Sequence, residues 1–336
     1  MKKEIGGYME FERLGGSDYY PDLYKFNLGR TALVWLLEQL ACKRLYVPCY
    51  CCDSVAKTAR NAGFDVELYH MDEKLHPLFE DTGFTLEEGE WLYLVNYYGQ
   101  LTDEKIAAYK ERYGRVIVDN AQSFFQKPVC GLPTIYSCRK FIGVTDGAYL
   151  ELGTENGLSK EAMKAAHSKF EALPSDTTKD RIGYLFGRLE ENARDYYSEM
   201  LAQSDKFAEA APKKMSLLTE NILRGIDYAR VRERRVSNYL TLQKLLPTDN
   251  PFTKRVPIAP FAYPYYHEDG LALRKAMAAK NIFIPTNWSY LVDNDSASAL
   301  EQEWSANILP LPVDQRYGEE EMTYLAKMIR EYGGYC

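Results

Sequence analysis

Histidines and paired cysteines are scarce in this chain of 336 residues, and their scarcity argues against a metal site. There are four histidines, none of them in a His-Glu-x-x-His segment. Cys49 and Cys52 form a Cys-x-x-Cys pair, but no second such pair follows. Because a zinc site of this type needs four ligands, we interpret the pair as small residues in a packed turn and predict no metal.

Long apolar stretches and targeting signals are lacking too. The apolar runs, such as residues 91–95 and 116–118, are far shorter than the roughly 20 residues that a membrane-spanning helix needs. No apolar segment follows the lysines at the N-terminus, so we expect neither a signal peptide nor a membrane partner. Seven mostly scattered cysteines, an odd number, favour a cytoplasmic protein over a disulfide framework.

The chain also lacks a basic tail, and its formal net charge is −7. That charge argues against nucleic-acid binding, although a few arginines and backbone amides can still form a local anion site. What is present is an ordinary globular composition, with 46% hydrophobic and 26% charged residues. A chain of this length can form one large domain and a smaller one.

Short apolar runs alternate with helical patterns through the first third of the chain. Such alternation is typical of βαβ units, so we predict an α/β fold with a mainly parallel sheet. The predicted strands are 44–47, 66–68, 92–95 and 116–118, and the predicted helices are 33–40, 54–62 and 103–113.

The pattern becomes helical and charge-rich from about 159 to 246, where Arg230, Arg232, Arg234 and Arg235 cluster on what we interpret as a solvated helix face. The proline-punctuated segment 247–260 indicates a crossing into a second domain. We therefore predict a large domain at 1–246, with a helical insertion at about 155–215, and a small α/β domain at 247–336. The small domain is expected to hold helices at 271–279 and 319–332 and a strand at 282–284.

Three local patterns carry residues suited to chemistry. Gly29, Arg30 and Thr31 form a glycine turn that opens a helix, where free amides and a hydroxyl suit a phosphate. Asp119 ends an apolar run; it either caps the next helix or pairs with a cationic ring nitrogen. Lys140 is flanked by apolar residues, with Ser137 three positions earlier, and desolvation would make its amine nucleophilic.

Taken in order, these patterns resemble the DegT/DnrJ/EryC1/StrS family of sugar aminotransferases, which are fold-type I pyridoxal-phosphate enzymes. The resemblance covers nearly the whole chain. It is carried by Gly-Arg-Thr at 29–31, Tyr-Val-Pro at 46–48, Asn-Ala-Gly at 61–63, Tyr-Gly-Gln at 98–100, Asp119 with Gln122, Lys140 with Asp-Gly at 146–147, and Leu-Pro-Leu-Pro at 309–312.

The resemblance implies a seven-stranded, mostly parallel sheet and a role for each matching residue. Lys140 is implied to bind pyridoxal 5′-phosphate covalently and then to move the substrate's α-proton, while Asp119 keeps the pyridine nitrogen protonated. The ring's phenolic oxygen is implied to be contacted by Gln122. The phosphate is implied to be anchored by Gly29, Arg30, Thr31 and Ser137.

The chain departs from the family pattern at three positions. Cys52 stands where an aromatic side chain stacks on the cofactor, so Tyr50 or Tyr98 is expected to stack instead. Pro212 replaces an asparagine that reaches the partner subunit's phosphate, although Lys214 keeps a cation nearby. Asn287 followed by Trp288 replaces a histidine and an aromatic residue. We expect Tyr98, Lys214, Asn287 and Trp288 to contact the substrate.

The function implied by the resemblance is amino transfer from glutamate or another amino acid to a nucleotide-linked keto-sugar, in a homodimer. Two alternatives remain open: a pyridoxal-phosphate enzyme with a non-sugar substrate, such as another transaminase, a lyase or a racemase, and a non-catalytic binding or structural subunit. A nicotinamide-binding protein is disfavoured because no Gly-x-Gly-x-x-Gly follows an early strand.

Overall fold

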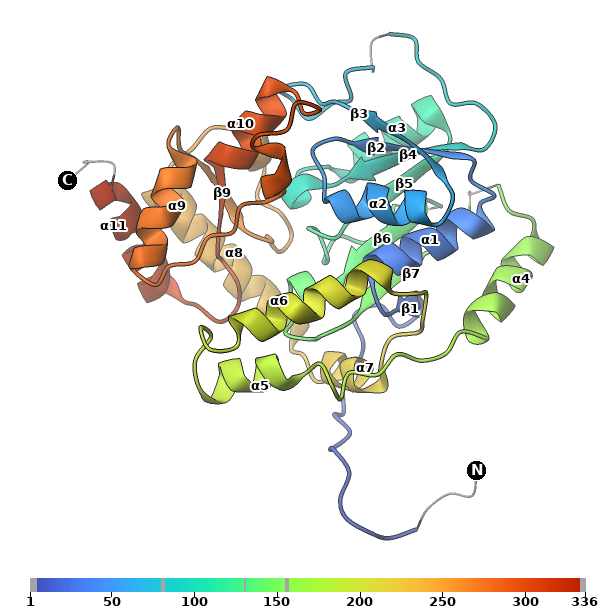
Figure 1. The fold of residues 1–336 in the computed structure, drawn as a ribbon, viewed down its shortest axis with the longest axis horizontal. Helices are drawn as coiled ribbons and strands as arrows, with labels where there is room; N and C mark the ends of the chain where they lie inside the picture. The colour runs from blue at the N-terminus through green and yellow to red at the C-terminus, as the bar shows by residue number, and fades with distance from the viewer. Residues whose placement is uncertain (1–4, 80–81, 130, 155–156, 333–336) are drawn as a thin grey trace.

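A seven-stranded sheet forms the centre of the protein in the computed structural model, which describes residues 5–79, 82–129, 131–154 and 157–332 (Figure 1). The strand order is β1-β7-β6-β5-β4-β2-β3. The five strands from β6 to β3 run parallel, while β7 is antiparallel to both β6 and β1. The strands are β1 (Tyr24–Phe26), β2 (Arg44–Pro48), β3 (Asp65–Tyr69), β4 (Glu90–Val95), β5 (Val116–Asp119), β6 (Thr134–Ser137) and β7 (Ala148–Glu151).

Three helices connect the parallel strands, as the alternating pattern predicted. They are α1 (Gly29–Gln39), α2 (Asp53–Asn61) and α3 (Asp103–Tyr113). Helix α3 begins where the Thr102 hydroxyl caps the N–H of Lys105, and it ends at Gly114, whose φ of 73° suits glycine. Every residue of β4 and β5 is buried, because helices cover both faces of a parallel sheet.

The middle of the chain is helical, again as predicted. Its elements are α4 (Lys160–Glu171), α5 (Gly183–Glu190), α6 (Tyr197–Asp205), α7 (Leu217–Arg224) and α8 (Tyr228–Leu245), with the 3-10 turn η3 (Lys206–Glu209) after α6. Serine side chains cap α4 and α7 through Ser159 and Ser216. No helix of the described residues is long and apolar enough to span a bilayer.

The C-terminal part has its own apolar core around a two-stranded antiparallel sheet, β8 (Tyr263–Tyr266) with β9 (Ile308–Leu311). Around it lie α9 (Gly270–Ala279), α10 (Ala299–Asn307), α11 (Glu319–Tyr332) and the turns η4 (Pro251–Thr253) and η5 (Ser289–Leu291). This core also takes Tyr239 and Leu242 from α8. The division of the chain at about residue 246 stays a prediction.

The strand predicted at 282–284 is wrong. Asn281 adopts a φ of 60° after α9, and the N–H of Ile282 bonds back to the carbonyl of Met277. This tight helix end places Ile284 in the second core with no strand beside it. Of this short apolar run only Ile284 is buried, while Phe283 is 62% exposed, and apolar composition alone does not distinguish a strand from such a segment.

Candidate active site

Asp119 and Lys140 lie close together at the carboxyl edge of the central sheet. Asp119 ends β5, and Lys140 ends the 3-10 turn η2 (Cys138–Lys140) that follows β6. Asp119 accepts a hydrogen bond from the N–H of Ala121 at 2.8 Å, and the Tyr93 hydroxyl is near enough to lower the pKa of its carboxyl. Burial raises the pKa of the Asp119 carboxyl, and the charge of Lys140 opposes that rise. Open α/β sheets gather their ligands at this edge.

Three side chains that the sequence analysis missed surround this pair. The Tyr93 hydroxyl is close enough to Asp119 to affect the pKa of its carboxyl, and the Phe261 ring centroid lies 5.7 Å from the Lys140 amine. Burial, and then the charge of Asp119, raises the pKa of the Cys51 thiol. Of these three residues, only Tyr93 could have been found from the sequence. It is a tyrosine inside an apolar strand, and a buried phenol needs a polar partner.

Asp146 and Gly147 pack against the turn that carries Lys140. The buried Asp146 carboxylate accepts hydrogen bonds from the Ser216 N–H and hydroxyl, both at 2.8 Å, and from the Thr219 hydroxyl at 2.5 Å. Gly147 has a φ of 123°, and a Cβ there would lie 2.3 Å from the sulfur of Cys138. The acidic-glycine turn predicted beside Lys140 therefore positions the lysine turn.

Arg235 hydrogen-bonds the backbone directly after the turn that carries Lys140. Its guanidinium donates to the carbonyls of Phe141 at 3.1 Å and Pro260 at 3.0 Å, and Gln315 donates to the same Phe141 carbonyl at 2.7 Å. The interpretation of this arginine as part of a solvated face is wrong, since only 1% of it is exposed. Its neighbours Arg232 and Arg234 are exposed, because α8 turns only one face inward.

The predicted phosphate turn lies against β6, beside the lysine turn. A Cβ at Gly29 would lie 3.6 Å from the Ile135 side chain, so the start of α1 packs on that strand. Leu28 provides no side-chain cap, and no acidic residue stands in the first turn. The Thr31 hydroxyl, however, lies 2.6 Å from the Asn27 amide oxygen and 2.9 Å from the Leu28 carbonyl, so within the chain it is already engaged.

Gln122, Tyr98 and Asn287 form one connected group. The Gln122 side-chain oxygen accepts from the Tyr98 N–H at 2.9 Å, and the Asn287 amide donates to the Tyr98 hydroxyl at 2.9 Å. Tyr98 holds a left-handed φ of 50° in the turn η1 (Tyr97–Gly99), a conformation that a bulky side chain rarely adopts. Tyr98 is 0% exposed, as Tyr50 is, so the expectation that it stacks on the cofactor or contacts the substrate does not fit this structure.

The other predicted residues fall into different surroundings. Tyr50 is fully buried, and Trp288 packs edge-on against it with ring centroids 4.4 Å apart. Tyr50 is therefore part of the core, with no face open to stack on a ligand. Cys52 precedes α2 and lies 3.0 Å from the Ser54 hydroxyl. Lys214 is bound to Glu171, 3.0 Å from its carbonyl oxygen.

No family model matches the sequence, and no curated protein matches it. Solved structures do match. A DegT/DnrJ/EryC1/StrS aminotransferase from Brucella abortus matches at 14% identity and a TM-score of 0.58, over 92% of this chain and 85% of its own. Spr1654 of Streptococcus pneumoniae, described as a sugar aminotransferase and solved in its PLP form, matches at 13% identity and a TM-score of 0.60. The match covers 93% of this chain and 86% of that protein. DesI, solved in the presence of its TDP-sugar product, matches at 12% identity and a TM-score of 0.62. The match covers 92% of this chain and 79% of that protein.

This chain has the sugar-aminotransferase fold. The expectation of an α/β fold with a seven-stranded, mostly parallel sheet is thereby confirmed. In this fold Asp119 and Lys140 come together as the resemblance implied, whereas Tyr50 and Lys214 lie in other surroundings.

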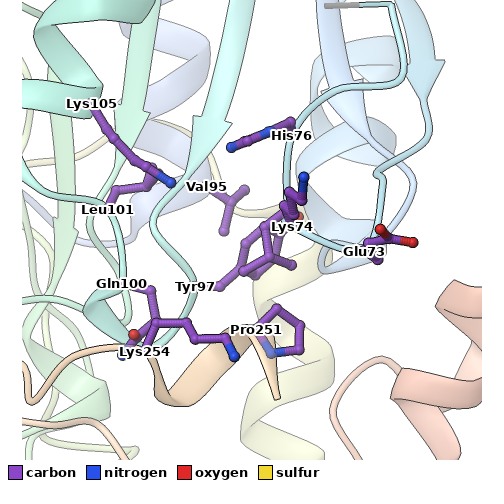
Figure 2. A pocket seen from close by; sticks show the side chains of 11 residues that line it. Glu73, Lys74, His76, Val95, Tyr97, Gln100, Leu101, Lys105, Pro251 and Lys254 are labelled. Atoms are coloured by element: carbon purple, nitrogen blue, oxygen red, sulfur yellow. The ribbon is translucent and has the colours of Figure 1, made fainter. Parts of the chain in front are cut away.

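A cavity of about 240 Å³ lies in this aminotransferase fold between the loop after β3, η1 and η4 (Figure 2). Three lysines from three segments line it: Lys74, Lys105 and Lys254. It shares the η1 turn with the candidate site, with Tyr97 in its wall, but neither Asp119 nor Lys140 lines it.

Cys49, His70 and Glu301 form a second polar group, with possible metal-ligand atoms within 4.8 Å of one another. The His70 ring nitrogen lies 2.8 Å from the buried Glu301 carboxylate, which also accepts the N–H groups of Met71 and Ser298. These bonds cap α10 and fasten it to the end of β3, so a structural role already accounts for Glu301. The absence of a metal stays a prediction.

Proposed function

We propose that this protein is a pyridoxal-phosphate-dependent aminotransferase that moves an amino group from an amino acid, glutamate in the simplest case, to a nucleotide-linked keto-sugar. The carrying observation is the buried Asp119 beside Lys140 at the carboxyl edge of a sugar-aminotransferase fold. DesI, which shares the fold, was solved with a TDP-sugar product, which supports the class of acceptor.

The residues present fit the cofactor. A buried carboxylate gains from a cationic partner, which a protonated pyridine nitrogen supplies, and Asp119 would hold the proton there. The uncapped start of α1 presents amides suited to a phosphate. When bound, pyridoxal phosphate supplies an electron sink for the carbanion at the substrate's α-carbon.

Side chains of the protein would bind the cofactor and move the proton. Lys140 binds the cofactor through its amine and, once displaced by substrate, takes and returns the proton at the α-carbon. The Gln122 amide nitrogen is free to donate while its oxygen holds the Tyr98 N–H. Lys140 is exposed in the structure, so the expected desolvation of its amine is not found, and the Phe261 ring lies 5.7 Å from that amine.

The test is spectroscopic. Purified protein with pyridoxal phosphate should show a cofactor absorbance that glutamate shifts, and one member of a panel of nucleotide keto-sugars should restore it. Borohydride reduction and peptide mapping should find the label on Lys140, with Lys105→Ala as the unaffected control. Restoration by simple keto acids alone would favour a non-sugar aminotransferase, and failure to bind the cofactor would leave a non-catalytic subunit.

Assembly as a homodimer and a cytoplasmic location belong to the same proposal. The five cysteines in the described part of the chain, Cys42, Cys49, Cys51, Cys52 and Cys138, are free thiols, which suits a reducing compartment. Light scattering on the purified protein would determine the oligomeric state, and a monomeric mass would remove the dimer from the proposal.

A further inference from the structure

Arg139, directly before Lys140, holds a largely buried guanidinium that has no counter-charge. Its Nε atom has no hydrogen-bond partner, and no carboxylate among the described residues forms an ion pair with it. Its neighbours are the Phe207 ring, 4.6 Å from its central carbon, and the Tyr184 hydroxyl. The positive charge of Arg30 is also close enough to oppose its own. Burying a cation without a counter-charge lowers the free energy of unfolding.

Arg181 also has an Nε atom without a hydrogen-bond partner, but unlike Arg139 it has an acid beside it. Its central carbon lies 5.5 Å from the same Phe207 ring. Asp176 neutralises it, with the carboxylate oxygen 2.9 Å from a guanidinium nitrogen. Two arginines therefore share one aromatic neighbour, and only Arg139 is left without an acid.

The start of α1 is a second group of unsatisfied donors in the same region. Leu28 does not cap the helix, and the first turn holds no acidic residue. Gly29 packs on Ile135 of β6, the strand that leads through Ser137 to Arg139. Helix amides and two guanidinium groups therefore surround one region of positive potential beside the lysine turn.

We propose that Arg139, together with Arg30 and the first amides of α1, binds the phosphate group of the cofactor. The inference rests on the proposed function and adds a residue to it. In the cofactor, the methylene that bears the phosphate ester and the aldehyde that reacts with a lysine are attached to neighbouring ring carbons. A phosphate held this way must lie near the residues that flank Lys140. Arg139 can offer it a forked, charge-assisted pair of hydrogen bonds.

The turn η3 and helix α5 take part in this arrangement, because they supply Phe207 and Tyr184. Phe207 contacts the guanidinium by a cation–π interaction, and Tyr184 is close enough to affect the pKa of Arg139. The helical insertion thus forms one wall of the phosphate site.

The experiment compares the binding of pyridoxal phosphate with that of pyridoxal, which lacks the phosphate. Absorbance titrations would use the full-length wild type, Arg139→Gln and the control Arg188→Gln, an exposed arginine of α5. We expect Arg139→Gln to weaken pyridoxal phosphate binding by about 10- to 100-fold and pyridoxal binding by less than about threefold. Arg188→Gln should match the wild type for both. The melting temperature of cofactor-free Arg139→Gln should be unchanged or higher.

Equal weakening of both ligands, or a lower melting temperature without cofactor, would assign Arg139 a structural role and overturn the proposal. Unchanged cofactor binding with a raised KM for a phosphorylated acceptor would also overturn it. Tyr184→Phe gives a milder variant in case Arg139→Gln fails to fold. If the wild type binds no cofactor, the proposed function fails. In that case, if inorganic phosphate stabilises the wild type but not Arg139→Gln, the anion site at Arg139 still stands. If inorganic phosphate does not stabilise the wild type, both the anion site and the proposed function fail.

Discussion

At the scale of single residues, the candidate site contains an acid and a base that are each buried at a cost. Asp119 has a raised pKa because it is desolvated, and Arg139 has a lowered one for the same reason. Neither group has found its full counter-charge within the chain. A ligand that carries a cation at one end and an anion at the other would stabilise both.

Asp119→Asn should therefore separate stability from function. Turnover should fall by several orders of magnitude, since an amide cannot hold the proton on the pyridine nitrogen. The free energy of unfolding of the cofactor-free protein at pH 7 should stay equal or rise by about 1 kcal/mol, because a buried charge is removed. Activity assays and urea unfolding measure the two effects.

The effect of Asp119→Asn on stability should depend on pH. A carboxyl whose pKa is raised in the folded state favours folding below its ordinary pKa of about 3.9, and this contribution is lost as pH rises through the raised value. The stability of the variant relative to wild type should therefore be greater at pH 7 than at pH 4. A variant that loses equal stability at both values would support the helix-capping role of Asp119.

Sequence reasoning at this scale identified Asp119, Lys140 and Gln122, because each stands at a fixed place relative to a strand or turn. It missed Arg139, Arg235 and Tyr93, whose roles depend on burial by segments far along the chain. Nothing local distinguishes Arg235, which is 1% exposed, from the exposed arginines beside it.

At the scale of elements, the lysine turn is fixed by two contacts that leave little freedom. Gly147 permits Cys138 to pack directly on the chain, and Arg235 holds the Phe141 carbonyl. The strands at 44–47, 66–68, 92–95 and 116–118 were predicted to within one or two residues at each end, because buried parallel strands are continuous apolar runs. Strand β8 was missed, since its sequence Tyr-Pro-Tyr-Tyr includes a proline that argues against a strand.

Gly147→Ala should destabilise the protein by about 3 kcal/mol or more, because the new methyl group would lie 2.3 Å from the Cys138 sulfur at a φ of 123°. Gly143→Ala is the matched control, since nothing lies within 4 Å of its added Cβ. Denaturant unfolding of the two variants measures the difference. Equal stabilities would show that the turn adjusts freely.

Arg235→Met should cost about 3 kcal/mol, because it leaves the buried carbonyls of Phe141 and Pro260 without this donor. Arg232→Met, on the exposed face of the same helix, should change stability by less than about 0.5 kcal/mol. Thermal unfolding compares them. Similar losses in both variants would assign the effect to helix propensity instead of the buried contacts.

At the scale of the whole molecule, two apolar cores meet around the candidate site. The large sheet supplies Asp119 and the lysine turn, while the C-terminal part supplies Phe261, Asn287 and Gln315. The sequence indicated both parts, but these contacts between them join residues more than 120 positions apart. No local pattern encodes such contacts.

Because the site joins both parts, ligand binding should stabilise the entire fold. Pyridoxal phosphate at about 100 times its dissociation constant should raise the free energy of unfolding by about 2.7 kcal/mol. Lys140→Ala should lose most of this gain, whereas Lys105→Ala should keep it. Thermal unfolding with and without cofactor tests this, and equal gains in both variants would show that the cofactor binds away from Lys140.

The bond between Phe141 and Gln315 also sets an order of events during synthesis. The two residues are 174 positions apart. At about 5 to 20 residues per second, a ribosome needs on the order of 10 to 35 seconds to pass from one to the other. Until then the nascent chain can form the large sheet, yet its lysine turn lacks one of the donors that hold it. A part of the chain that is translated much later therefore completes the surroundings of Lys140.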